Sequence, residues 1–468
     1  MSVTENRLEF KKFEQEIFRA VCQLGCDLIR STLERCDEDI FSNEEGKFYQ
    51  SKGFRQTCIK TVMGEVTFKR RMYETVCDDG SKQYVYLLDE AIGRTGSGFF
   101  SELLLEMIAK TACESSYRAA ARSVSELTGQ SISHTAAWSA VQQLGERLNE
   151  QELNNSALAK KNSGKGELES KVLFEEMDGV KLQLQGKSRK EHGPSKELKV
   201  AIAYNGAKKV GKKRFSLTNK VATANFEEAK KFRSRKEGTI AAAYNIDEVE
   251  IRLLNGDGAN WINESAAADT HFQLDHFHIS QAITRNISNE EMRSTIRELL
   301  YSKQIKLMLD VIEAYCNSVE KEKEREKALE LYSYFHNNKD YLIPCHRRGL
   351  NLPKPPKDIV YRRMGAMESN IFTIIGNRMK GRRACWSING GNNLARLLCL
   401  KATGKLSQSL QMLATVALPE RYAEEVEVKI SAASVPIREG KGYNGFHQFL
   451  VPSSMPWLKN IAALRPLS

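Results

Sequence analysis

Three acidic residues stand where the surrounding pattern predicts the ends of structural elements. Asp178 ends a predicted strand in the segment MDGV, Asp257 ends another in LLNGDGA, and Glu368 begins a predicted helix in MESNIF. Carboxylate oxygens are hard ligands that suit Mg²⁺. Two such ions can hold the attacking and leaving oxygens of a phosphate diester in line. The chemistry that these residues could perform is therefore metal-dependent phosphoryl transfer.

The segment 171–288 is predicted to place the two aspartates in one sheet. Alternating patterns predict strands in KVLFEEMDGVKLQLQ, KELKVAIAYNG and KRFSLTNKVATA, and further strands in EVEIRLLNGDG and HFQLD alternate with helices. This order is the ribonuclease H-like arrangement, an α/β fold with a mixed sheet and helices on both faces. Its first and fourth strands are neighbours, so we expect Asp178 and Asp257 to meet at one edge of the sheet.

Glu368 is separated from that sheet by a long insertion. Residues 289–359 carry apolar side chains at helical spacing, which predicts an all-α insertion before the catalytic domain resumes at 360–406. The helix that begins at Glu368 carries an apolar face made of Ile371, Phe372, Ile375 and Met379. We expect this face to pack on the sheet and to turn Glu368 inward, toward the metal ions.

Each aspartate also has an ordinary structural interpretation. An aspartate at a strand end often forms a turn or a cap, and the NGDG around Asp257 also spells a tight turn. Glu176 shares its strand face with Asp178, so it is the substitute ligand if Asp178 is not one.

The N-terminal part is predicted to bind DNA. Residues 1–98 show an amphipathic helix and a small β element, and residues 99–148 are mainly helical. Within the latter, Ser116 and Ser133 can each cap a helix across the break at Thr128-Gly129, which predicts a helix-turn-helix. The second helix would offer polar side chains to base edges or phosphates, namely His134, Thr135, Ser139 and Gln142. The alternative is an ordinary helical hairpin.

Two further segments and one basic run complete the prediction. Residues 149–170 are polar and rich in Gly, Ser and Asn, which predicts a linker, and 407–468 form a C-terminal segment without a predicted role. The Glu368 helix ends in cations suited to DNA phosphates: Arg378, Lys380, Arg382 and Arg383. Trp386 could stack on a base near the cleaved end, or it could anchor a core or an interface.

Composition and charge favour an intracellular protein with an anionic partner. The 70 Lys and Arg residues exceed the 59 acids, which gives a net charge of +11 and makes nucleic acid the leading candidate. No apolar run reaches the roughly 18 residues of a membrane helix, and the first residues lack the apolar core of a secretory signal. Ten cysteines without a CxxC pair argue against a disulfide framework and a zinc knuckle.

Together, these motifs resemble a known family. Asp178, Asp257 and Glu368 look like the DDE triad of transposases, and an all-α insertion before the glutamate is similar to that of the Mutator-like group. The stretches MDGVKLQLQGK, RLLNGDGANWI, HFQLDHFH and RRACWSINGGNNLARLL resemble ISLre-type bacterial insertion-sequence transposases, and the likeness extends to about residue 406. The resemblance implies a cytoplasmic, nucleoid-associated DNA transposase.

The resemblance also implies a mechanism and partners. Such an enzyme binds the terminal inverted repeats of its insertion sequence and catalyses DNA cleavage and strand transfer. Asp178, Asp257 and Glu368 would hold two Mg²⁺ ions, with Mn²⁺ as a substitute. His278, in an Asp-x-x-His motif from Asp275, would act near the scissile phosphate; its alternative is a hydrogen bond to a nearby carbonyl. The partners would be double-stranded DNA of the element and the target, and further copies of the chain in a homodimer or larger assembly, without a membrane.

Two other functions compete with this one. A domesticated transposase could act as a non-catalytic, sequence-specific DNA-binding regulator. A structure-specific nuclease of the same fold would cut junctions or RNA–DNA hybrids without inverted repeats.

Overall fold

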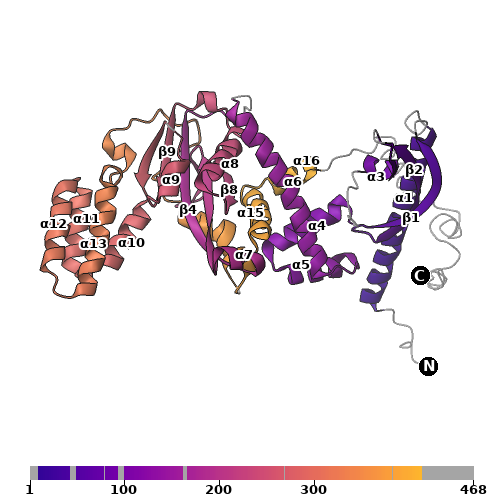
Figure 1. Ribbon diagram of the computed structural model, residues 1–468, viewed down its shortest axis with the longest axis horizontal. Helices are drawn as coiled ribbons and strands as arrows, with labels where there is room; N and C mark the ends of the chain where they lie inside the picture. Colours follow the sequence, from indigo (N-terminus) through magenta and orange to yellow (C-terminus); the bar gives the residue numbers. More distant parts are fainter. Residues whose placement is uncertain are drawn as a thin grey trace, which may run out of the picture. The chain divides into compact units, whose positions relative to one another are not determined.

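The computed structural model describes residues 9–42, 49–77, 80–92, 100–161, 166–267, 269–381 and 383–413 (Figure 1). The chain divides into two compact units, which consist of Met1–Leu104, Thr128–Gln130 and Ala414–Ser468, and of Leu105–Leu127 and Ser131–Leu413. Within the described ranges, no helix is both long and apolar enough to cross a membrane. All ten cysteines are free thiols in this structure.

The first unit contains a long helix and a small antiparallel sheet. Its described elements are α1 (Phe10–Ser42), β1 (Gln50–Lys60), β2 (Glu65–Val76), β3 (Lys82–Val85) and α3 (Leu87–Ala91), and the strands are neighbours in the order β1-β2-β3. Leu33 of α1 shares a core with Phe68 of β2 and Leu88 of α3. Arg71 of β2 is buried and donates to the carboxylate of Asp37 at 2.7 Å. This arginine therefore stabilises the unit from inside.

The second unit is built on a mixed sheet. Its strands are neighbours in the order β10 (Thr270–Leu274), β9 (Ile251–Gly256), β4 (Val172–Leu184), β5 (Ser195–Tyr204) and β8 (Val221–Asn225), as Figure 1 shows in part. Strand β5 is antiparallel to β4 and β8, whereas β9 is parallel to β4 and β10. The short β11 (Cys385–Trp386) pairs with the far end of β4. The predicted mixed sheet is confirmed, and β4 lies at its centre.

Helices cover both faces of this sheet. Successive side chains of a strand point to opposite faces. Glu175 of β4 contacts Lys236 of α8 (Ala229–Ala241), whereas the next residue, Glu176, contacts the start of α14 (Met367–Ile371). Helices α8 and α14 therefore lie on opposite faces. The remaining elements around the sheet are α7 (Gly186–His192), β6 (Ala207–Lys209), β7 (Phe215–Leu217), η1 (Ile246–Glu248), α9 (Asn260–Ser265), η4 (Phe372–Lys380), α15 (Ile388–Ala402) and α16 (Leu406–Leu413).

The chain between β10 and α14 is helical. It forms α10 (His276–Asn286), α11 (Glu290–Tyr301), α12 (Ile305–Ser318), α13 (Glu322–Asn337), η2 (Lys339–Tyr341) and η3 (Cys345–Arg348), and α11, α12 and α13 stand side by side (Figure 1). Ile312 and Phe335 from these helices belong to the same buried cluster as Met177 and Leu254 from the sheet. The insertion is thus part of the core of the second unit.

Helix α6 extends further than the sequence pattern predicts. The helices α4 (Glu102–Glu114) and α5 (Tyr117–Thr128) are followed by α6 (His134–Lys160), which includes most of the predicted linker 149–170. Glu152 of α6 accepts from Arg235 at 2.9 Å and from Arg396 at 3.0 Å. The linker prediction is wrong for 149–160, because this stretch continues α6 and its Glu152 pairs with arginines of α8 and α15.

A buried ion-pair network fixes α8 on the sheet. Arg252 of β9 donates to Glu175 at 2.7 Å and to Glu237 at 2.9 Å, and Lys236 pairs with both carboxylates. Burial alone would raise the pKa of Glu237, but Lys236 and Arg252 outweigh it and lower the pKa to about 2. Two cations and two anions balance each other, so removing one leaves an uncompensated buried charge.

We therefore expect Lys236→Met to destabilise the protein by about 3 kcal/mol, the lower end of the range for a broken buried pair, because Arg252 remains beside Glu175. The measurement is the free energy of unfolding in urea. The control is Lys230→Met, an exposed lysine of the same helix, which should change that free energy by less than about 0.5 kcal/mol. Equal unfolding midpoints for both variants would contradict a stabilising network.

Candidate functional site

Asp178 and Asp257 lie near each other where β9 ends beside β4. The two strands pair with each other in parallel as far as Glu176 and Asn255, two residues before each aspartate. Asp257 directly follows β9, as predicted, but Asp178 lies inside β4, which continues to Leu184 and stays paired with β5, so the predicted strand end at Asp178 is wrong. Burial raises the pKa of Asp257, and the negative charge of Asp178 adds to the rise. The structure thus brings together the two carboxylates that the sequence places far apart.

His278 joins this pair from α10. Asp275 caps that helix, since its side chain accepts from the backbone N–H of Phe277 at 3.0 Å. The cap fixes the first turn, from which the Nε2 of His278 lies 3.5 Å from Oδ2 of Asp178. Burial lowers the pKa of His278, but its hydrogen bond to Asp178 and the charges of the three nearby aspartates outweigh burial and raise it. The contact with Asp178 therefore stabilises the protonated form of His278.

The loop that carries Asp257 is held by the insertion. The carboxylate of Asp257 accepts from the backbone N–H of Ala259 at 2.8 Å, and its carbonyl accepts from the hydroxyl of Tyr334 at 2.7 Å. Gly258 has a φ of +86°, and a side chain there would clash with Asn338, the residue directly after α13. The insertion thus determines where Asp257 lies.

Glu197 of β5 is a further acid at this edge that the sequence analysis missed. Burial raises its pKa, and the charges of Asp257 and Asp178 add to the rise while Lys199 opposes it. The signal in the sequence is an isolated acid in the strand KELKVAIAY, opposite Lys181 of β4. In the described ranges, however, no three His, Cys, Asp or Glu side chains converge closely enough to hold a metal ion.

Glu368 differs from its prediction, because it is exposed on α14. Of the predicted apolar face, Ile375 and Met379 are buried, but Ile371 and Phe372 are not. The other buried residues of α14 and η4 are Met367, Asn370 and Ile374. From Phe372 onward the helix is of the π type, which has more residues per turn and changes the phase that an α-helical spacing predicts. The expectation that Glu368 points inward is therefore wrong for this structure.

Glu176 holds the start of α14 instead of facing the aspartates. Its side chain is fully buried. Its carboxylate accepts hydrogen bonds from the backbone N–H groups of Gly365 (3.0 Å), Ala366 (2.9 Å) and Met367 (3.2 Å), the hydroxyl of Tyr204 (2.6 Å) and the amide of Asn255 (3.3 Å). Burial raises the pKa of Glu176, against the effect of these donors. The structure does not support Glu176 as a substitute metal ligand, because its oxygens are already occupied.

The predicted DNA-reading residues of α6 divide into two groups. His134 and Thr135 are exposed and Ser139 is half-buried. Gln142 is buried, and its side-chain oxygen accepts from the amide of Asn393 in α15 at 2.9 Å. The prediction for Gln142 is contradicted because α6 packs on α15 along this side. Trp138, which the sequence analysis passed over, is 45% exposed beside His134 and Thr135.

The predicted basic run also divides. Lys380 and Arg383 are exposed, and Arg382 lies outside the described residues. Arg378 donates to the carbonyl of Ala112 at 2.7 Å and lies over the ring of Trp386. Trp386 is buried and donates to the carbonyl of Met379 at 2.9 Å. Of the two interpretations of Trp386, the structure favours the core anchor.

Two sequence comparisons point to the same protein family. Residues 3–414 match the sequence model of an uncharacterised protein family, UPF0236. A relative from Streptococcus gallolyticus, described as the UPF0236 protein in the vanSb 3′ region, is 24% identical over 404 residues, which cover 84% of this chain and 83% of the relative. Among solved structures, the Drosophila P element transposase strand transfer complex aligns with a TM-score of 0.23 and 11% identity over 78% of this chain and 93% of that chain.

We expect Asp178→Asn to lower the pKa of His278 in the metal-free protein, because the substitution removes the negative charge beside the imidazole. The stability that this contact contributes is fully present below the unfolded-state pKa of about 6.5 and is lost as the pH rises through the raised pKa of the folded state. The measurement is an NMR titration of the histidine ring protons. His276, whose pKa is lowered by burial and by Arg363, is the internal control and should keep its value. An unchanged His278 titration would contradict the contact.

Proposed function

The chain belongs to the uncharacterised protein family UPF0236, and we propose that it is a DDE transposase that cuts DNA at the ends of its own insertion sequence and joins them to a target. The observation that carries the proposal is the meeting of Asp178, Asp257 and His278 at one edge of a mixed sheet. The motif resemblance to ISLre-type transposases supports the same assignment.

The strand order supports a ribonuclease H-like core. Three consecutive strands, β4, β5 and β8, are antiparallel, and β9 and β10 add in parallel on the other side of β4. This is the arrangement that the sequence pattern predicts, and it sets the first and fourth strands of the core side by side. Asp257 directly follows β9, and Asp178 lies on β4 just beyond the residues that pair with β9, so both carboxylates lie at the same part of the sheet.

The donor set fits divalent metal ions. Asp178 and Asp257 are oxygen donors near each other. Burial raises the pKa of Asp257 and the charge of Asp178 adds to the rise, and a bound cation would oppose both effects. When bound, two Mg²⁺ ions, or Mn²⁺ in their place, would activate the attacking oxygen and stabilise the leaving oxygen. We propose Glu368 as the third carboxylate, which requires that α14 turns its exposed side chain toward the aspartates when DNA binds.

His278 and the exposed cations have separate roles in this proposal. His278 beside Asp178, when protonated, can donate to a phosphate oxygen and hold the scissile diester. His134, Thr135 and Trp138 at the start of α6 would contact the inverted repeats through the helix-turn-helix, and Lys380 and Arg383 would contact phosphates. Since two ends have to be paired, we propose a homodimer or a larger assembly on DNA.

One observation favours a second candidate. Glu368 is exposed, and the described residues contain no group of three metal ligands. A DNA-binding regulator without chemistry needs neither an inward-facing Glu368 nor a set of three metal ligands. Catalysis therefore separates the two candidates.

The test uses the full chain with a labelled DNA end from beside its own gene, Mg²⁺ and a target plasmid. We expect Asp178→Ala and Asp257→Ala each to reduce cleavage and strand transfer at least about 100-fold, equivalent to about 2.7 kcal/mol of transition-state stabilisation, without loss of end binding in a mobility-shift assay. The control is Asp310→Ala on the exposed side of α12, which should cleave normally. Normal cleavage by either active-site variant would refute the assignment.

The same assay distinguishes transposase from nuclease. We expect cleavage of duplexes that contain the inverted repeat and none of Holliday junctions or RNA–DNA hybrids that lack it. Cleavage of the latter two at equal rates would favour a structure-specific nuclease. End binding without any Mg²⁺-dependent cleavage would favour the regulator.

A further inference from the structure

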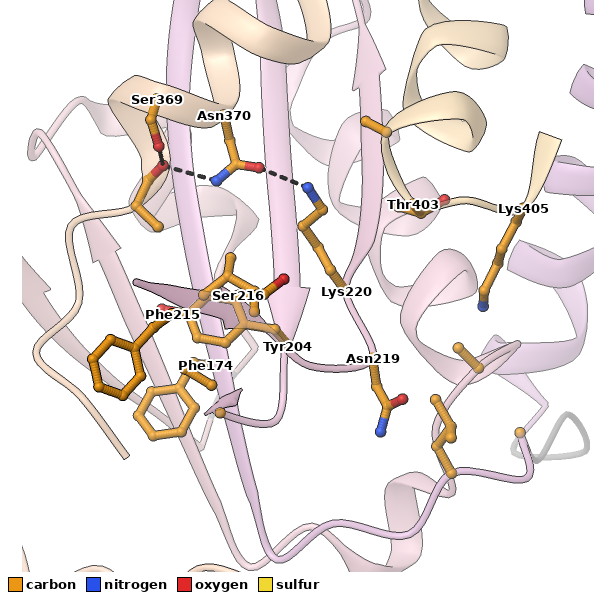
Figure 2. A pocket seen from close by; sticks show the side chains of 18 of the residues that line it. Phe174, Tyr204, Phe215, Ser216, Asn219, Lys220, Ser369, Asn370, Thr403 and Lys405 are labelled. Carbon is orange, nitrogen blue, oxygen red and sulfur yellow. Dashed lines mark hydrogen bonds between the residues drawn. The ribbon is translucent and has the colours of Figure 1, made fainter. Parts of the chain in front are cut away.

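A cavity of about 1300 Å³ lies beside α14 in the second unit (Figure 2). The sheet contributes Phe174 and Tyr204 to its wall, α14 contributes Ser369 and Asn370, and other segments contribute Phe215, Lys220, Thr403 and Lys405. Asp178, Asp257, His278 and Glu368 are not among its described lining residues. The cavity is therefore distinct from the acidic site.

The described lining is strongly cationic. It contains Lys220, Arg362, Arg363 and Lys405 but one acid, Glu167. Across the described residues, none of the four cations forms an ion pair with a carboxylate. Four positive charges around one cavity repel each other unless an anion compensates them. The charge distribution thus favours an anionic ligand.

Lys220 is the best-positioned cation. It is half-buried, and its Nζ donates to the side-chain oxygen of Asn370 at 2.9 Å. Asn370 is oriented in turn by donating to the carbonyl of Ala366 at 2.8 Å (Figure 2). Burial lowers the pKa of Lys220. An ammonium group has three donors, and the neutral amide oxygen satisfies one of them, so an anion in the cavity would both supply acceptors and favour the protonated amine.

The lining also contains aromatic rings and a guanidinium plane. Phe174 and Tyr204 stack with their ring centroids 5.5 Å apart, and the guanidinium of Arg362 lies 3.9 Å from the ring centroid of Phe215. Aromatic rings and guanidinium planes are the surfaces on which nucleobases stack. The cavity is also much larger than a single phosphate group requires.

We propose that this cavity binds the phosphate groups of a nucleotide, either free or as one unit of a nucleic-acid strand. Lys220 and Lys405 bind the phosphates, and the Phe215–Arg362 stack contacts the base. Ser216 and Thr403, which also line the cavity, supply hydroxyl donors. The inference goes beyond the proposed function because it uses none of the residues of the acidic site.

The experiment measures binding to the full chain by isothermal titration calorimetry, with EDTA present so that the acidic site holds no metal. The probes are pyrophosphate, ATP and a 5′-phosphorylated thymidine tetranucleotide. We expect Lys220→Met to weaken binding of these probes at least about tenfold, equivalent to about 1.4 kcal/mol. Lys405→Met, a second cation of the same cavity, should weaken it as well. The matched control, Lys208→Met, changes an exposed lysine of β6 that does not line the cavity, and it should bind like the unaltered chain.

The probes distinguish the two sources of phosphate. Tighter binding of ATP than of the tetranucleotide indicates a free nucleotide, and the reverse order indicates a strand. We also expect the affinity to fall as the pH rises, because Lys220 has to be protonated. Since burial lowers the pKa of Lys220, this fall should occur at a lower pH than for an ordinary lysine. Asp178→Ala should bind the probes normally, so a failure of the transposase proposal leaves this test unaffected. Absence of binding by all three probes, or equal affinity of Lys220→Met and Lys208→Met, would overturn the inference.

Discussion

The buried carboxylate of Glu176 is the interaction on which the second unit most depends. It binds three consecutive backbone N–H groups at the start of α14, and it continues a row of polar side chains across four strands, from Gln273 through Asn255 to Tyr204. Gln273 also accepts from the backbone N–H of Cys345 at 3.0 Å. A charge in a low-dielectric interior is tolerated only when its partners are complete. The row therefore couples strand register, the end of the insertion and the beginning of α14.

The neighbouring Glu175 performs the corresponding task on the opposite face. Its partners are Lys236 of α8 and Arg252 of β9, both buried. Two adjacent glutamates in one central strand thus fix one helix on each face of the sheet, because the side chains of a strand alternate between its faces. The aspartate two residues after Glu176 stays close to the surface, where β9 has ended, and this difference in burial separates the structural acids from the candidate catalytic acid.

Helix α14 connects the two candidate sites. Ser369 and Asn370 line the cationic cavity, Glu368 next to them is exposed, and the helix start is bound to Glu176. A change in the phase of this helix would move Glu368 and the acceptor of Lys220 together. The π-helical η4, which follows directly, is the kind of segment in which helix phase changes and which often occurs at functional sites.

Hydrophobic periodicity and turn residues are local properties, so they were enough to predict the alternation of strands and helices, the helical insertion and the position of Asp257 directly after a strand. They did not predict that β4 continues past Asp178 to Leu184. The sequence also indicated His278 through the motif around Asp275. Contacts between distant segments explain the remaining features. Glu176 caps a helix 189 residues further along the chain, and Glu368 faces outward. Gln142 and Trp386 are buried, and Lys220 lines a cationic cavity. These outcomes depend on which distant groups satisfy a buried charge or amide and on the phase of a π-helix. No local pattern encodes either of them.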